Sequence, residues 1–359
     1  MNKLQVLEEY VHKKLLRKSE TEDLVQYNYT EYCNNNALWD DITITNRGNI
    51  YEKSTGNLVA KAMPKFMNLY QLPKEQQDLL LQHQDINVTE KMDGCLGILY
   101  MYKGEIRCNS RGGFDNYVTD KIKQLLPKYS MLYKMLEHNT LLVEVISPQT
   151  KIICNYDTED LYLITVYSNN PQIGELSYEQ IKIMAQIMKM PVVKEYHMTW
   201  DELLTFQKVA DWRQEGFVVR IGNTRVKIKS EDYLKIAKLR ANLCKHTVWK
   251  LMKNDFEQHI DTLKHYLENV PDELSVTAQR YHKELLDEMN HHHANALVLY
   301  DELKNVDTSE LHNYFLKNPS QYQACVYNLR NAKNIDKLLI KMIEPQRGFE
   351  NMENMLCRE

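Results

Sequence analysis

Residues 94–114 of the 359-residue chain read GCLGILYMYKGEIRCNSRGGF. Two runs rich in apolar, β-branched and aromatic residues flank Lys103 and Gly104, so the stretch predicts a β-hairpin with its turn at this pair. Further short runs with strand composition follow at residues 140–148, 161–168, 216–222 and 225–230. Helical stretches lie between them without a regular βαβ rhythm, which indicates an α+β fold with antiparallel sheets.

The chain has different patterns on either side of this β-rich zone. The N-terminal part opens with a helix that carries Leu4, Leu7 and Val11 on one face, and it continues into strand-like runs at residues 40–51 and 57–70. From residue 244 onward, apolar residues recur at helical spacing and strand signals are nearly absent. We therefore expect one domain over residues 1–243 and an all-α C-terminal domain over residues 244–359.

The composition is that of a globular protein, with 43% hydrophobic and 26% charged residues. No apolar run approaches the ~20 residues that span a bilayer, so we expect a cytoplasmic protein with no membrane partner. Seven scattered cysteines without a CxxC pair predict neither a disulfide framework nor a zinc site. The net charge of −4 means that any binding of nucleic acid must depend on local basic clusters. The sequence does not determine an oligomeric state.

The segment EKMDG at residues 90–94 places Lys91 before an Asp-Gly pair. A motif this short arises by chance and usually marks a surface turn. Three later segments change that interpretation. Glu144 is a charge inside an apolar strand, Glu215 directly precedes another strand, and Lys227 and Lys229 alternate along a third, so both lysines point to one face.

Nucleotidyl transfer to an amine requires these kinds of group. The nucleophile is a lysine that must be neutral when it attacks. Further cations are needed to neutralise the phosphates as pyrophosphate leaves. Carboxylates hold magnesium through its waters, because this ion dehydrates reluctantly.

The ordered segments KMDG, SRGGF, LLVEVISP, LYLITVY, EGFVV and VKIK resemble the motif series of the covalent nucleotidyltransferases, the superfamily of DNA ligases, RNA ligases and mRNA capping enzymes. EGFVV followed by VKIKSEDYL, with NRGNIYE and PKFMNLY upstream, is more narrowly similar to the RNA ligases typified by the tRNA-repair enzyme of T-even phages. The resemblance covers residues 40–243 and implies a nucleotidyltransferase domain with an ATP-grasp-like fold.

The resemblance implies a role for each matching residue. Lys91 would carry AMP, and Lys227 and Lys229 would contact the α-phosphate. Glu215 would bind the catalytic metal through water, and Glu144 would contact the ribose or a metal-bound water. The remaining matches are polar or aromatic positions. Arg47 and Lys65 would engage the pyrophosphate portion of ATP. Ser110 and Arg111 would lie near the nucleotide and the RNA end. The ATP site would also include Glu90, and Tyr162 would pack against the adenine.

One position departs from the family pattern. The family commonly has serine after the Asp-Gly pair, whereas this chain has Cys95. Both residues are small, so we expect Cys95 to pack and a hydrogen bond to weaken. A catalytic thiol is the less favoured interpretation, because no histidine adjoins Cys95 in sequence.

Two further patterns do not require a role in catalysis. Successive helical residues point about 100° apart, so the run His291, His292, His293 indicates a solvated helix face rather than a metal site. The basic stretch at residues 235–246, with lysine at 235, 238 and 245 and arginine at 240, is either a solvated face or a contact with the RNA backbone. The sequence leaves these two interpretations of the basic stretch open.

The helical tail distinguishes members of the superfamily, because DNA ligases and capping enzymes resemble one another in placing an OB domain there. We therefore predict an ATP-dependent RNA ligase that joins 5′-phosphate and 3′-hydroxyl RNA ends through lysyl-AMP and RNA-adenylate. The resemblance implies ATP and Mg²⁺ as cofactors, with Mn²⁺ as an alternative, and a role in RNA repair, cleaved tRNA being one candidate substrate. The alternatives are a catalytically silent module that binds RNA ends, a DNA ligase, and a capping enzyme.

Overall fold

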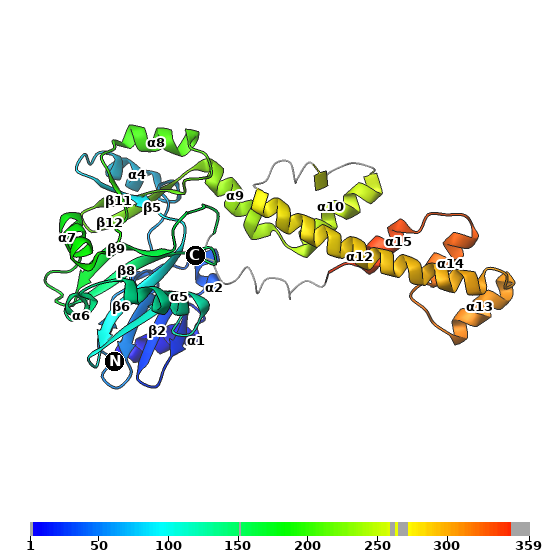
Figure 1. Cartoon of the computed structure of the whole chain (residues 1–359), viewed down its shortest axis with the longest axis horizontal. Coiled ribbons are helices and arrows are strands. Elements are labelled where there is room, and N and C mark those ends of the chain that lie inside the picture. The colour runs from blue at the N-terminus through cyan, green and yellow to red at the C-terminus, as the bar shows by residue number, and fades with distance from the viewer. Residues whose placement is uncertain (1–2, 151, 259–262, 265–271, 346–359) are drawn as a thin grey trace. The chain divides into compact units, whose positions relative to one another are not determined.

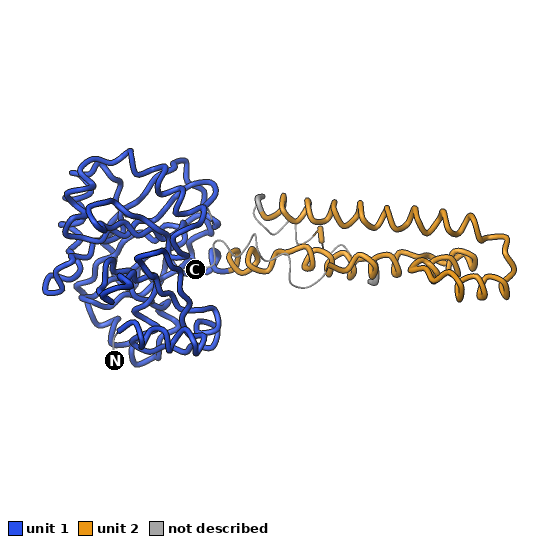
Figure 2. Tube along the Cα trace, turned by 90° about the horizontal axis from the view of Figure 1, so that it is seen from below, with its two compact units in different colours: residues 1–234 blue, residues 235–359 orange. Residues whose placement is uncertain are grey.

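A computed structural model describes residues 3–150, 152–258, 263–264 and 272–345. The chain divides into two compact units, residues 1–234 and 235–359, which are coloured separately in Figure 2. The division falls inside helix α9 (Glu231–Asn242), earlier than the expected boundary at residue 243. Ile236 and Leu239 of this helix pack against the core of the second unit, which is why the division precedes the end of the helix.

The first unit contains three antiparallel four-stranded sheets (Figure 1). The N-terminal sheet has the order β1 (Leu16–Glu20), β2 (Leu24–Tyr29), β3 (Arg47–Glu52), β4 (Leu58–Ala60). The central sheet has the order β7 (Glu105–Ser110), β6 (Cys95–Tyr102), β8 (Asn139–Ile146), β9 (Asp160–Ser168). The third sheet has the order β10 (Glu195–Tyr196), β5 (Asn87–Lys91), β11 (Gly216–Ile221), β12 (Thr224–Lys229).

Helices of the first unit lie between or after these strands. They are α1 (Lys3–His12), α2 (Glu31–Asn35), α3 (Asp41–Thr45), α4 (Lys74–Leu81), α5 (Tyr117–Leu125), α6 (Leu132–Leu136), α7 (Tyr178–Met188) and α8 (Trp200–Val209), with the 3₁₀ turns η1 (Leu69–Gln71) and η2 (Leu126–Lys128). Helices α5, α6 and α7 cover one face of the central sheet, where Leu99, Leu141 and Leu163 are fully buried. The other face packs against the N-terminal sheet through Ile98 and Ile50.

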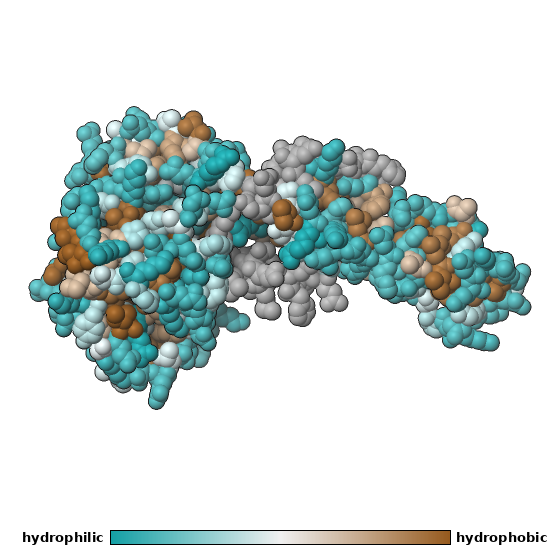
Figure 3. Space-filling view, viewed as in Figure 1, coloured by the Kyte–Doolittle hydropathy of each residue, from teal (hydrophilic) through white to brown (hydrophobic). Residues whose placement is uncertain are grey.

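The α+β fold with antiparallel sheets is therefore confirmed, and so is the hairpin at residues 94–114. Strands β6 and β7 pair from Gly97–Ser110 to Tyr102–Glu105, and Lys103 and Gly104 both have positive φ, as a tight hairpin turn requires. Ser177 caps α7 in a capping box with Gln180. On the face drawn in Figure 3, hydrophilic residues dominate the surface of this unit and hydrophobic ones are scattered in small groups.

Two strand predictions near the N-terminus are confirmed only in part, because β3 covers the end of the run at residues 40–51 and β4 the start of the run at residues 57–70. Residues 41–45 form helix α3 because Asp40 caps it in a capping box with Thr43, and this local hydrogen bonding outweighs the β-branched composition. In the run at residues 57–70, only β4 is a strand. Residues 63–67 belong to no helix or strand, and we call them the connector. Lys65 N donates to Ile44 O at one end of the connector, and Lys227 N donates to Met67 O at the other.

In the described residues of the second unit, the regular elements are all helices. Its helices are α10 (Lys245–Gln258), α12 (Asp272–Leu303), α13 (Thr308–Lys317), α14 (Gln323–Arg330) and α15 (Asp336–Met342). Helices α10, α14 and α15 pack against α12, with Trp249, Leu285 and Leu339 in the shared core (Figure 1). Among the described helices, none is both long and apolar enough to cross a membrane.

Candidate nucleotidyl-transfer site

The pairing of three strands brings Lys91 and Lys229 to the same face of the third sheet. In the register of this sheet, Gly216 of β11 lies opposite Lys91 of β5 on one side and opposite Lys229 of β12 on the other. A β-carbon at Gly216 would lie 2.0 Å from Ile228 O, and its φ of +147° disfavours any side chain. The glycine therefore leaves the space between the two lysines free of a side chain.

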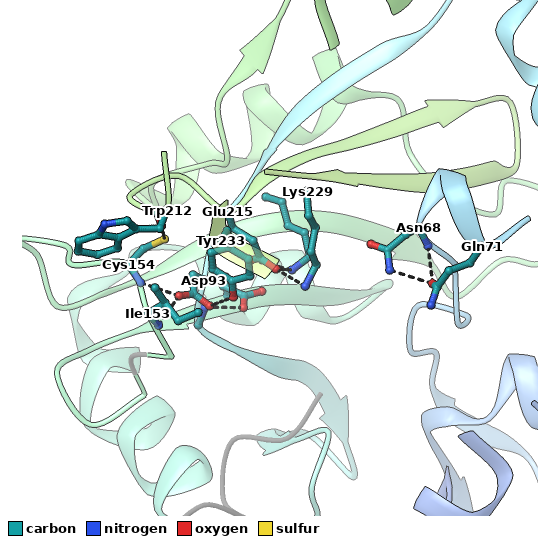
Figure 4. A network of polar contacts seen from close by, with 12 residues as sticks. Asn68, Gln71, Asp93, Ile153, Cys154, Trp212, Glu215, Lys229 and Tyr233 are labelled. Atoms are coloured by element: carbon teal, nitrogen blue, oxygen red, sulfur yellow. Dashed lines mark hydrogen bonds and ion pairs between the residues drawn. The ribbon is translucent and has the colours of Figure 1, made fainter. Parts of the chain in front are cut away.

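Glu215 joins these two lysines. Its carboxylate, only 1% exposed, lies 2.9 Å from Lys91 Nζ and 2.7 Å from Lys229 Nζ. Figure 4 shows the contact with Lys229. Glu215 therefore holds two ammonium groups side by side, and paired cations of this kind suit a ligand that carries phosphates.

Lys227 shares the face of Lys229, as the alternation predicted, whereas Val226 and Ile228 are buried on the other face. The Lys227 ammonium lies 5.0 Å from the ring centroid of Phe66, a cation–π contact with the connector. The connector therefore supports the lysine strand through both its backbone and an aromatic ring.

Asp93 anchors the turn after Lys91. Its carboxylate accepts hydrogen bonds from the backbone amides of Ile153 and Cys154, at 2.6 and 2.7 Å, and from the Tyr233 hydroxyl at 2.7 Å (Figure 4). Tyr233 also places its ring 5.2 Å from Lys229 Nζ. Tyr233 thus contacts both the turn of the nucleophile and the lysine strand.

Glu144 and Tyr162 lie on the face of the central sheet that Leu96 shares. They are cross-strand neighbours on β8 and β9, and Glu144 Oε1 accepts a hydrogen bond from Gly94 N at 3.1 Å. The backbone at Gly94 also approaches β8 closely, because a β-carbon there would lie 2.5 Å from Val145 O.

Arg47, Lys65 and Arg111 converge on Tyr29, and we call these four residues the basic cluster. Arg111 and Lys65 donate to the Tyr29 hydroxyl at 3.3 and 3.5 Å, and Lys65 also donates to Asn34 Oδ1 at 3.1 Å. Burial alone would raise the pKa of Tyr29, but the charges of Arg111, Arg47 and Lys65 outweigh it and lower that pKa. The cluster therefore concentrates positive charge strongly enough to favour an anion.

The side chain of Glu90 is on the opposite face of the third sheet from Lys91. It lies across from Phe217, which packs in the core behind the third sheet. Burial raises the pKa of Glu90, and the charge of Lys194 partly opposes this rise. The structure does not bring the Glu90 carboxylate to Lys91, Lys229 and Glu215.

The remaining candidates behave as ordinary structural residues. Cys95 packs against the core under α5. Ser110 Oγ donates to Asn116 Oδ1 at 3.1 Å. On α12, His292 shares a 2.8 Å hydrogen bond with Tyr322. No group of three acidic, cysteine or histidine side chains able to hold a metal occurs in the part of the chain that the structure describes.

In the basic stretch, Lys235 and Lys238 are exposed on α9. Lys245 instead lies 3.7 Å from both Glu284 and Glu288 of α12, so part of its charge is compensated within the helical unit.

Sequence reasoning missed Tyr29 and Tyr233 as members of the site. Tyr29 ends a strand of another sheet, and nothing in its local sequence distinguishes it from the other tyrosines of the chain. Tyr233 had a usable signal, because it lies four residues after Lys229, in the first turn of α9.

Comparison with known proteins identifies the family. The family model described as RNA ligase matches residues 45–234. A putative RNA ligase from Thermovibrio ammonificans is 28% identical over 150 residues, which cover 40% of this chain and 39% of the relative. The chain thus matches about two-fifths of the length of that relative.

The solved structures that the comparison found include two ligases. A mutant Naegleria gruberi RNA ligase with ATP and Mn is 16% identical, with a TM-score of 0.38 over 45% of this chain and 54% of that one. A putative ATP-dependent DNA ligase from Aquifex aeolicus is 18% identical, with a TM-score of 0.47 over 85% of this chain and 88% of that one. Because the family model spans more than half of its length, this chain belongs to the RNA ligase family.

Proposed function

We propose that this chain is an ATP-dependent RNA ligase that joins a 5′-phosphate to a 3′-hydroxyl through AMP carried on Lys91. The observation that carries the proposal is the buried arrangement in which Lys91 and Lys229, on either side of Gly216, share the carboxylate of Glu215. A structural ion pair would need one cation, whereas transfer of a phosphoryl group needs a nucleophile and a second cation beside it.

The site offers the groups that a nucleoside triphosphate requires. Lys91, Lys227 and Lys229 share one face of the third sheet, and the basic cluster supplies three further cations. Glu144 and Glu215 provide the carboxylate oxygens that a hard divalent cation prefers. Magnesium, or manganese in its place, would be held by these two residues through water and would neutralise charge on the phosphates.

In the proposed first step, Lys91 Nζ forms a bond to the α-phosphorus of ATP, and the bond from that phosphorus to the pyrophosphate oxygen breaks. The amine must first lose its proton, and the Glu215 oxygen at 2.9 Å is in position to accept it. Lys229 and Lys227 stabilise charge on the α-phosphate. Arg47 and Lys65 of the basic cluster hold the departing pyrophosphate.

In the second step, an oxygen of the RNA 5′-phosphate attacks the AMP phosphorus and releases Lys91. In the third, the 3′-hydroxyl attacks the 5′-phosphorus, a phosphodiester forms, and AMP leaves. We assign Tyr162 and the face it shares with Glu144 to the adenosine moiety, and Arg111 to the RNA end. Tyr29 holds three cations in place, and Tyr233 positions Asp93 and Lys229, so both act through the residues they contact.

Several wider features are part of the same proposal. The helical unit selects the RNA, with exposed Lys235 and Lys238 on α9 as candidate contacts to its backbone. The physiological role is repair of broken RNA, cleaved tRNA among the substrates, in the cytoplasm.

Labelled ATP tests the first step. The protein is incubated with α-labelled ATP and magnesium, and the expected product is a protein–AMP adduct that is stable to base and labile to acid, as a phosphoramidate is. Lys91→Ala should abolish the label, and the matched control Lys182→Ala, an exposed lysine on α7, should retain it. A label that persists in Lys91→Ala contradicts the assignment of the nucleophile.

A second assay separates the alternatives. A 5′-phosphorylated single-stranded RNA should give circles or dimers with ATP, and GTP should not replace ATP. Equal sealing of DNA ends would favour a DNA ligase, and adduct formation from GTP would favour a capping enzyme. Adduct formation with no joined product would indicate a module that binds RNA ends.

A further inference from the structure

A pocket of about 490 Å³ lies in the first unit, outside the residues assigned to ATP except for a shared edge. Its lining comes from the connector, from α4, and from the turn between β11 and β12. We call it the connector pocket. Met67, Leu79 and Leu80 contribute apolar surface to it, and Gln76 and Asn223 contribute carboxamides.

Helix α4 leaves this pocket open to solvent. None of its residues is fully buried, although it ends in three successive leucines, and Leu79 is 61% exposed. Leu80 and Leu81 pack partly against the core behind the third sheet, whereas Leu79 remains exposed at the pocket. The lining thus combines accessible apolar side chains with exposed amide groups, which is the composition of a site for a small planar ligand rather than of a core defect.

The pocket is continuous with the proposed site at two places. Phe66 lines it and also carries the Lys227 ammonium on its ring. Lys65 also lines the pocket. Its ammonium donates hydrogen bonds to Tyr29 of the basic cluster and to the neighbouring Asn34. A chain of phosphates that passes the basic cluster can therefore place an attached group in the connector pocket.

We propose that the connector pocket binds an unpaired nucleobase of the RNA strand next to the end being joined. This inference rests on the proposed function. A base has two apolar faces, which the methionine and leucine side chains would cover, and an edge of donors and acceptors, which Gln76 and Asn223 would bind. The volume falls within the range of about 300–1,000 Å³ typical of ligand sites. The neighbouring phosphate would meet Lys65.

Leu79→Glu tests the proposal, because it replaces an exposed apolar wall with a charge that repels phosphate. The matched control is Ile183→Glu on α7, where the isoleucine is 55% exposed. The measurement is the Kd for a 5′-phosphorylated oligoribonucleotide in the absence of ATP. We expect Leu79→Glu to weaken binding about tenfold or more and Ile183→Glu to leave it within about twofold. Unchanged binding in Leu79→Glu overturns the proposal.

Oligonucleotides with a single abasic position identify the bound base. In the unsubstituted protein, one abasic position should weaken binding, and Leu79→Glu should remove that difference because the two changes delete the same contact. Abasic penalties that are equal in both proteins contradict a base in this pocket.

Lysyl-AMP formation without RNA separates this proposal from the proposed function. It should stay within about twofold in Leu79→Glu, and the milder variant Leu79→Ala should reproduce the direction of the RNA effect. If the unsubstituted protein forms no adduct but binds RNA through the pocket, only the enzymatic proposal fails.

Discussion

Replacing Glu215 by glutamine should destabilise the first unit and abolish adduct formation. The substitution keeps the shape of the side chain but removes the one negative charge between Lys91 and Lys229. The two ammonium groups, 9% and 12% exposed, would then face a neutral amide that can present a donor to them.

The magnitude follows from the geometry. At separations of 2.9 and 2.7 Å, each ion pair contributes roughly 6 kcal/mol of attraction at an effective dielectric constant of about 20, before the cost of removing the charges from water. Desolvation offsets much of this, and breaking a buried pair by removing one partner costs about 3–5 kcal/mol. For a domain of this size, such a loss lowers the Tm by about 10 °C.

Thermal unfolding of the full chain, followed by tryptophan fluorescence, measures this change. Glu179→Gln, on the exposed side of α7, is the matched control and should unfold within about 1 °C of the unsubstituted protein. Lys91→Met combined with Glu215→Gln should lose less stability than the sum of the two single changes, because each removes the same contact. If Glu215→Gln unfolds at the unsubstituted temperature, the carboxylate does not hold two lysines and the reasoning fails.

Two further predictions use other features of the first unit. Gly216→Ala should lower the free energy of unfolding by about 2 kcal/mol or more, because the new β-carbon would meet Ile228 O. The control Gly222→Ala, with open space around the new β-carbon, should lower it by only about 1 kcal/mol. Chemical denaturation measures both changes. Tyr29 should ionise at lower pH than an ordinary tyrosine in an ultraviolet absorbance titration, and Tyr29→Phe should remove that early step. Because its folded pKa is lowered, Tyr29 contributes stability above the unfolded pKa near 10, and this contribution disappears as pH falls through the folded value. A titration in which no tyrosine ionises early would contradict the basic cluster.

Predictions from the sequence were reliable where a local period determines the outcome. The alternation of Lys227 and Lys229 with Val226 and Ile228 requires only strand geometry, and the register of β12 confirms it. The same alternation separates Glu90 from Lys91, so the assignment of the Glu90 side chain to the ATP site overlooked a rule that the sequence already supplied.

Propensity failed where hydrogen bonding to a cap outweighed composition. The β-branched residues 42–45 predicted a strand, but the cap at Asp40 stabilises a helical turn there. The conformation of the connector, residues 63–67, likewise could not be predicted from its composition, because its backbone hydrogen bonds are made with residues distant in the chain.

The sequence by itself determined that Lys91 begins an ordered series of carboxylates and lysines on successive strands, because the order of motifs and the period of a strand are local properties. The tertiary structure decided which of these groups meet. Lys91 and Glu215 are 124 positions apart, and only the pairing of β5 with β11 brings them into contact. The tertiary structure also places Tyr29 and Tyr233 in contact with the cations of the site. Contacts between separate elements depend on how those elements pack, which the periodicity of a single element does not determine.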